Sequence, residues 1–317
     1  MVDARTGPAS PVWDDTERAA LIALLRERPQ RMSWPDITAE VSSSGSARSV
    51  WDGLVPGDLF NTEPAALAEA SADIERWRAE DFHFSTFLDH EYPAQLREVH
   101  EMPPVLFSRG SLRAADPGVS VVGSRKASAR GLQVASTLAR NLAERNITVV
   151  SGLASGIDTA AHTAALDSGG RTVACVGTGI TVTYPAENRA LQEHIARDGL
   201  VLSQFWPDAP PQRQNFPMRN AVMSGYGRAT IIVEAGEHSG ARIQARQAVE
   251  HGRPVILVDN VVEANTWAKD IARRPGVHVA SGTQEVMDLV EEALNPSVPT
   301  EDLVDQLIRD QGGQSHR

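Results

Sequence analysis

Short apolar runs rich in valine alternate with longer helical segments from residue 119 onward. Seven such runs follow one another: VSVVG, ITVVSG, RTVACVG, LVLSQF, ATIIVEA, PVILVD and VHVAS. Continuous apolar runs are typical of parallel strands that are buried on both faces, and each intervening segment is long enough for a crossover helix. The sequence therefore predicts an α/β fold with a doubly wound, mostly parallel sheet.

The chain before this alternation has a different composition. DDTERAALIALLRER and EPAALAEASADIERWRAEDF have the spacing of amphipathic helices, whereas YPAQLREVHEMPPVLFSRG is predicted to be a connector that packs Leu106 and Phe107. We therefore expect a small helical N-terminal unit with its connector at residues 1–105 and a Rossmann-like domain at 106–295. A short C-terminal tail without a winged helix is expected at 296–317.

Charge and composition exclude several classes of protein. The formal net charge of -11 argues against a chain that coats nucleic acid with its whole surface, so a site for a polyanion must be local. No apolar run reaches the ~18 residues of a membrane helix, and the N-terminus lacks the apolar core of a signal peptide, which predicts a cytoplasmic protein. The single cysteine, Cys175, lies in an apolar run and is predicted to be buried.

Four of the predicted strands end in glycine-rich turns, GSRK, SGLASGID, GTGI and EAGEHSGAR. Ligands of such sheets bind at the carboxyl ends of the strands, where glycine allows close approach and helix N-termini attract anions. Any single turn could simply be tight, but four on one edge favour phosphate binding. The expected binding residues in these turns are Gly123, Ser124, Gly152, Gly156, Gly177, Gly179, Ser239 and Gly240.

The glycine-rich turns match neither of the two common nucleotide-binding motifs, but several cations lie in or near them. GTGITV has Val182 where the dinucleotide fingerprint needs its third glycine, and no P-loop motif occurs. Arg125 directly follows a glycine-serine pair and is the stronger phosphate ligand, because a guanidinium can donate two hydrogen bonds, whereas Lys126 could simply be solvated. The cations placed near strand ends are Arg125, Lys126, Arg213, Arg219 and Arg242.

Several long motifs resemble the DNA-processing protein A family, also called Smf. They are VVGSRKASARG, VVSGLASGIDTAAHTAAL, GGRTVACVGTGITVTYPAENRAL, PPQRQNFPMRNAVMSG and VVEAGEHSGARIQARQAVEHGRPV, and the likeness runs from about Tyr92 to about Pro254. The resemblance implies an extended Rossmann-like domain that binds and protects single-stranded DNA and helps to load a RecA-type recombinase during DNA uptake and recombination. It also implies a homodimer formed through this domain.

The resemblance assigns roles to particular residues. Gly123, Ser124 and Arg125 correspond to the family's strand-binding turn, and Arg213 and Phe216 of RQNFP correspond to its basic and aromatic pocket, with Asn220 nearby. Phe216 could stack on a base or pack in the core. The chain departs from the family pattern at Gln204, at Arg219-Asn220-Ala221, which lacks one arginine, and over residues 259–280.

Other interpretations remain open. A nucleotide-binding or nucleotide-sensing member of the superfamily, with a role in genome defence or a phosphoribohydrolase activity, would use the same edge, but the P-G-G-x-G-T-x-x-E motif of those hydrolases is absent. A structural protein that lost its ligand is a third interpretation. Asp158 and His162, four residues apart, are interpreted as a structural pair, and Glu234, Glu237 and His238 as a weak metal signal. We therefore expect no enzyme activity, no metal and no cofactor.

Overall fold

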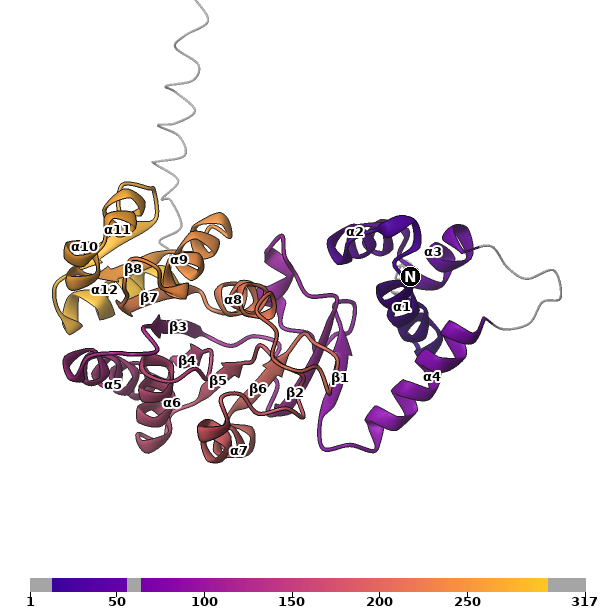
Figure 1. Cartoon of the computed structure of the whole chain (residues 1–317), viewed down its shortest axis with the longest axis horizontal. Helices are drawn as coiled ribbons and strands as arrows, with labels where there is room; N and C mark the ends of the chain where they lie inside the picture. The colour runs from indigo at the N-terminus through magenta and orange to yellow at the C-terminus, as the bar shows by residue number, and fades with distance from the viewer. Residues whose placement is uncertain (1–12, 56–63, 296–317) are drawn as a thin grey trace, which may run out of the picture.

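The computed structural model describes residues 13–55 and 64–295, and a nine-stranded sheet runs through its centre (Figure 1). The strand order is β1-β2-β6-β5-β4-β3-β7-β8-β9, and all pairs from β6 to β9 are parallel. The seven predicted strands are β3 (Gly118–Gly123), β4 (Thr148–Ser151), β5 (Thr172–Cys175), β6 (Leu200–Ser203), β7 (Ala229–Glu234), β8 (Val255–Val258) and β9 (Val277–Ala280). The predicted doubly wound, mostly parallel α/β fold is confirmed.

Two strands of the sheet go beyond the sequence prediction. β1 (His83–Thr86) pairs antiparallel with β2 (Val105–Gly110), and β2 pairs antiparallel with β6. The interpretation of residues 92–110 as a connector was wrong for β2, because the apolar run of this strand is limited to residues 105–107 and is followed by Ser108, Arg109 and Gly110. The sheet thus begins at residue 83, ahead of residue 106, while the division into domains remains a prediction.

Helices cover both faces of the sheet. One face carries α5 (Ala129–Glu144), α6 (Ile157–Asp167), α7 (Arg189–Asp198) and α12 (Thr283–Leu294). The other carries α8 (Asn215–Tyr226), α9 (Gly240–Glu250), α10 (Asp259–Ala264) and α11 (Thr266–Ile271) (Figure 1). On α5, Leu138 and Leu142 are buried against the sheet and Arg140 is exposed, as helical spacing dictates. Among the described helices, none has the length and apolar character needed to cross a bilayer.

The direction of winding reverses next to β3. After β3 the chain adds β4, β5 and β6 on one side, and then it returns to add β7, β8 and β9 on the other. The helix after β3 and the helix after β7 therefore cover opposite faces, which opens a crevice at the carboxyl ends of these two strands. This crevice is the place where a fold of this type binds ligands.

The N-terminal unit consists of α1 (Asp15–Glu27), α2 (Trp34–Ser44), α3 (Ala47–Leu54) and α4 (Ala65–Arg78). Asp14 caps α1, and Ser33 with Asp36 forms a capping box at α2. Trp77 of α4 packs on the antiparallel edge of the sheet, with its ring centroid 5.0 Å from that of Phe107. The expected helical N-terminal unit is present, whereas the tail predicted at 296–317 lies outside the described residues.

Candidate functional site

A groove of about 920 Å³ occupies the crevice at the carboxyl ends of β3 and β7. Its walls are the loop after β3, the loop before α9 with the first turns of that helix, and α8 with the loop before it. A recess of about 50 Å³ that shares Arg125, Tyr184 and Phe216 with the groove adds Gly152 and Gly177. The groove is lined by these sequence-predicted residues: Gly123, Ser124, Arg125, Lys126, Arg213, Phe216, Arg219, Asn220, Ser239 and Gly240.

The turn after β3 is held rigidly by its neighbours. The Ser124 N–H donates to the Glu234 carbonyl at 2.7 Å, and a side chain at Gly123 would meet that carbonyl at the same distance. Gly156 has a φ of +82°, and a Cβ there would clash with the Ser124 carbonyl. Gly156 therefore supports the turn from beneath and lines neither the groove nor the recess. The backbone that carries Arg125 is fixed before any ligand arrives.

Arg125 projects from this turn over an aromatic ring. Its guanidinium carbon lies 5.0 Å from the centroid of Phe216, and the ring of Tyr184 lies 5.7 Å from Phe216 at an angle of 49°. A Cβ at Gly177 would come within 3.0 Å of the Phe216 ring, so the glycine makes room for it. Phe216 is partly exposed and Tyr184 is 41% exposed. The site thus combines a cation with two accessible aromatic rings.

The other exposed cations of the groove are Lys126 and Arg213. Within residues 13–55 and 64–295, neither of them nor Arg125 forms an ion pair with a carboxylate. A cation without a carboxylate partner keeps its full charge for a ligand. These three side chains give the groove an uncompensated positive charge.

Arg219 differs from these cations because it is buried in the floor of the groove, with 5% of its surface exposed. Its Nη1 donates to the carbonyl oxygens of Gly152 and Cys175, which join the ends of β4 and β5. A Cβ at Gly152 would overlap this guanidinium. Burial lowers the pKa of Arg219, and the charge of Asp158 opposes this shift. Arg219 therefore holds two strand ends together beneath the exposed cations.

Asp158 and His162 belong to separate networks. Burial raises the pKa of Asp158, and this carboxylate accepts from the N–H groups of Gly152 and Ala154 at 3.1 and 3.3 Å. His162 Nδ1 lies 2.6 Å from the Thr172 hydroxyl oxygen. Burial lowers the pKa of His162 to about 3. Both residues have structural partners, and Asp158 fixes the loop that carries Gly152.

The remaining predicted residues hold loops in place or shape the groove. Ser239 caps α9 by accepting from the Ala241 N–H at 3.2 Å, and the space around Gly240 is open. Asn220 is 8% exposed on α8. Gly179 lines neither the groove nor the recess, because it packs on the backbone of residues 206–207 and donates to the Ala209 carbonyl at 2.8 Å. Gly179 therefore shapes the loop after β5 and has no surface in the groove.

The acidic residues near the groove are engaged in turns. Glu234 accepts from the backbone N–H of Ser128 at 2.9 Å, and Glu237 accepts from the N–H of Thr266 at 2.9 Å. Over the part of the chain that the structure describes, no three His, Cys, Asp or Glu side chains gather in a way that could hold a metal ion. These carboxylates position the loops that carry the cations.

Sequence reasoning missed Tyr184 and His238 as lining residues of the groove. Tyr184 lies in the loop after β5, within the motif GTGITVTYP, and an aromatic residue in a glycine-rich loop at a strand end was the available signal. Arg242, expected among the cations of this edge, instead lines a neighbouring cleft. The groove as built can bind phosphates with its cations and offer aromatic faces for stacking.

The fold and this crevice define a Rossmann-like α/β protein with a groove of exposed cations at its switch point. The chain belongs to the DNA recombination-mediator protein A family, whose model matches residues 83–291. This match confirms the resemblance seen in the sequence. It includes β1 and β2, the two strands that the sequence did not predict.

Relatives and solved structures agree with this assignment. DNA processing protein DprA of Streptococcus pneumoniae is 43% identical over 174 residues (55% of this chain, 61% of that protein). Protein Smf of Synechocystis sp. is 39% identical over 192 residues (59% of this chain, 48% of that protein), so the chain spans about half to three fifths of these relatives.

The crystal structure of the Streptococcus pneumoniae protein superposes with a TM-score of 0.66 at 29% identity, covering 86% of this chain and 95% of that one. DNA processing protein A from Helicobacter pylori, described for its single-stranded DNA binding mode, gives a TM-score of 0.59 at 24% identity (67% of this chain, 97% of that one). The second likeness concerns the fold alone.

Proposed function

We propose that the protein binds single-stranded DNA in the groove at the carboxyl ends of β3 and β7. The observation that carries this proposal is a set of three cations, Arg125, Lys126 and Arg213, that have no carboxylate partner among the described residues and lie in one groove with Phe216 and Tyr184. The cations would contact backbone phosphates, and the rings would stack on bases. Each stacked base contributes ~1 to 3 kcal/mol.

The same chemistry favours a single strand over a duplex. A duplex hides the faces of its bases in the helical stack, whereas a single strand presents both its phosphates and its base faces. Contacts with phosphates and base faces depend little on the base sequence. We therefore expect tighter binding to single strands than to duplex in a competition titration, with weak dependence on base sequence. Equal affinity for the two forms contradicts the proposal.

The family supports the proposal and its biological setting. The Helicobacter pylori protein is described by its single-stranded DNA binding mode, and the Streptococcus pneumoniae relative is named for DNA processing. We infer that this chain also protects single strands and assists a RecA-type recombinase, and that it acts as a homodimer without consuming a nucleotide. Two linked grooves would raise the affinity for long strands. Light scattering of the protein alone, combined with affinity as a function of oligonucleotide length, tests the dimer.

The central experiment replaces Arg125 or Arg213 with alanine. Each change removes a charge-assisted hydrogen bond worth about 1.5 to 3 kcal/mol, so the affinity for labelled single-stranded DNA should fall by about tenfold or more. The slope of log affinity against log salt should fall by ~0.7 for each phosphate that the variant no longer neutralises. Fluorescence anisotropy at several salt concentrations measures both quantities.

Arg140→Ala is the matched control, because Arg140 is exposed on α5 outside the lining of the groove. It should leave affinity and salt slope unchanged. If Arg125→Ala and Arg213→Ala both bind single-stranded DNA as tightly as the parent does, the groove is not the DNA site. Release of free base from nucleoside monophosphates, detected by chromatography, would instead favour a phosphoribohydrolase.

A further inference from the structure

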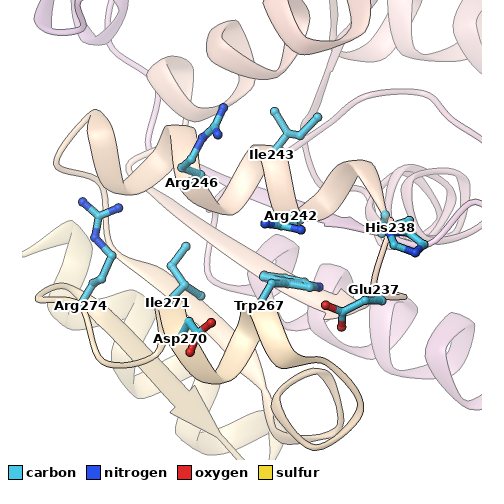
Figure 2. A pocket seen from close by; sticks show the side chains of 10 residues that line it. Glu237, His238, Arg242, Ile243, Arg246, Trp267, Asp270, Ile271 and Arg274 are labelled. Atoms are coloured by element: carbon cyan, nitrogen blue, oxygen red, sulfur yellow. The ribbon is translucent and has the colours of Figure 1, made fainter.

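A second cleft, of about 590 Å³, lies between α9 and α11 (Figure 2). One wall is the exposed side of α9, which carries Arg242 and Arg246. The other wall is α11 and the residues after it, which carry Trp267 and Arg274. This second wall belongs to residues 259–280, the segment in which the chain departs from the family pattern. This divergent segment therefore forms one wall of a cleft beside the groove.

The cleft continues the groove. His238, Ser239 and Ile243 line both cavities, so the two hollows meet at the start of α9. Arg242 lies in the first turn of this helix, and Arg246 follows one turn later, about 6 Å farther along the axis. The border between the two hollows is therefore formed by His238, Ser239 and Ile243, and a chain molecule that leaves the groove past Ser239 reaches the cleft next.

Two arginines of the cleft are available to an anion. Figure 2 shows the Arg242 guanidinium lying between α9 and Trp267, while Arg274 extends toward α9 from the opposite wall. Neither pairs with a carboxylate among the described residues. Arg246, in contrast, lies 3.6 Å from the carboxylate of Glu250.

Two carboxylates also line the cleft. Glu237 accepts from the Thr266 N–H at 2.9 Å, which fixes it at the start of α11. Asp270 is exposed on the same wall as Arg274 and reduces the positive charge there. With Arg246 compensated by Glu250, Glu237 and Asp270 equal Arg242 and Arg274 in number, but neither of these arginines is ion-paired with them, so both guanidinium groups can still donate to a phosphate.

The floor between these cations is apolar. Trp267 and Ile271 are 6% and 8% exposed, and Ile243 lines the wall of α9. The indole nitrogen of Trp267 is buried without a hydrogen-bond partner among the described residues and points toward Glu237 in Figure 2. Cations above an apolar floor match a nucleotide unit, whose phosphate is charged and whose base and sugar have apolar faces. The volume lies in the range of about 300 to 1,000 Å³ that is usual for small-ligand pockets.

We propose that the cleft binds the continuation of the single strand held in the groove, with Arg242 and Arg274 contacting its phosphates. This inference rests on the proposed function, and it extends the footprint of the strand onto the chain's divergent segment. A short strand would fill the groove alone, whereas a longer strand would also occupy the cleft. The two cavities thus contribute to affinity at different oligonucleotide lengths.

The test compares oligothymidylates of about 5 and about 15 nucleotides, within the site sizes of ~4 to 16 nucleotides known for single-strand binding modules. The proteins are the parent, Arg274→Ala, the double variant Arg242→Ala/Arg274→Ala, and Arg140→Ala as the control. The double variant should bind the short strand as the parent does, and its affinity for the long strand should fall by about tenfold or more. Its salt slope for the long strand should fall by ~0.7 for each phosphate that it no longer neutralises.

The outcomes separate this inference from the proposed function. If Arg125→Ala weakens both strands while the double variant weakens neither, the groove binds DNA and the cleft does not. If neither strand binds the parent, the proposed function is wrong. A third outcome is that the parent binds free thymidine monophosphate, the double variant does not, and both bind the long strand equally well. In that case the cleft is a separate nucleotide site and does not bind the continuation of the strand. Thermal melting of each variant excludes loss of folding.

Discussion

Both edges of the sheet carry exposed or partly exposed cations, but in the part of the chain that the structure describes those at the amino edge are paired with carboxylates and those at the carboxyl edge are not. At the amino end of the strands, a cavity of about 1150 Å³ is lined by Arg145, Arg228 and Arg253. Each of these pairs with a glutamate: Arg145 with Glu291 at 3.1 Å, and Arg228 and Arg253 with Glu98 at 3.0 and 2.8 Å. At the carboxyl end, Arg125, Lys126 and Arg213 have no such partner within the described ranges.

This contrast shows why neither size nor arginine content identifies the site. The amino-edge cavity is the larger of the two, yet its charges neutralise one another and hold the fold together. The groove keeps its cations available to a ligand and places Phe216 beneath one of them. A chain with a net charge of -11 can bind a polyanion only where the surplus of acidic residues is locally reversed, and the groove provides such a place.

The largest expected effect concerns Arg219, the buried cation beneath the groove. Arg219→Ala removes the donor to Gly152 and Cys175 and leaves Asp158 without its nearby positive charge. Loss of one member of such a buried charged group costs about 3 to 5 kcal/mol, which urea unfolding measures. Arg219→Met keeps most of the volume of the side chain, so it measures the loss of the charge and its hydrogen bonds without the cavity that alanine leaves. Arg125→Ala should change the free energy of unfolding by less than about 0.5 kcal/mol. If both variants were destabilised equally, Arg219 and Arg125 would not differ as a structural and an available cation.

The next effect concerns the aromatic wall of the groove. Phe216→Ala should weaken single-strand binding by about 1 to 3 kcal/mol because a base can no longer stack there, with little change in the salt slope. The ring is partly exposed, so a moderate fall in melting temperature is expected alongside. Phe216→Tyr keeps the ring face and should bind as the parent does. A parallel fall in affinity and salt slope for Phe216→Ala would mean that the ring acts only by positioning Arg125.

A third effect arises in the interior, where burial holds His162 neutral. The pKa of His162 is about 3 in the folded chain against an ordinary value of 6.5, so between these values only the unfolded chain binds the proton. The free energy of unfolding therefore falls as the pH falls below 6.5, by about 1.3 kcal/mol between pH 7 and pH 5.5 from this group. Urea unfolding at both pH values measures the difference. His162→Gln should remove this part of the pH dependence, and an unchanged slope in the variant contradicts the assignment.

Much of this architecture could be predicted from local sequence. The seven valine-rich runs became strands β3 to β9, and the glycine-rich turns met at one edge because parallel strands place their carboxyl ends together. The buried Cys175 also followed from its apolar surroundings, and burial raises the pKa of its thiol to about 12. These features depend on the chain within a few residues of each position.

The features that could not be predicted depend on contacts distant in sequence. β1 and β2 are defined by their antiparallel pairing, and their apolar residues resemble those of a loop that packs on a core. The burial of Arg219 depends on carbonyls 67 and 44 residues away, so the sequence could not separate it from the exposed Arg125 and Arg213. The position of Arg242 in the cleft depends on α11, which comes from the divergent segment.

The smallest expected effect comes from the paired amino edge. Arg253 Nη2 donates to the Glu98 carboxylate at 2.8 Å and to the Gln95 carbonyl at 3.1 Å. Glu98 is 45% exposed and keeps its second partner, Arg228, when Arg253 is replaced, so Arg253→Ala should cost about 1 kcal/mol of stability. Its affinity for single-stranded DNA and its salt slope should equal those of the parent, because a cation already paired with a carboxylate offers little to a phosphate. If Arg253→Ala weakened binding by the same factor as Arg125→Ala, the pairing of charges would not distinguish the two edges, and the strand would have to be placed at the amino edge as well.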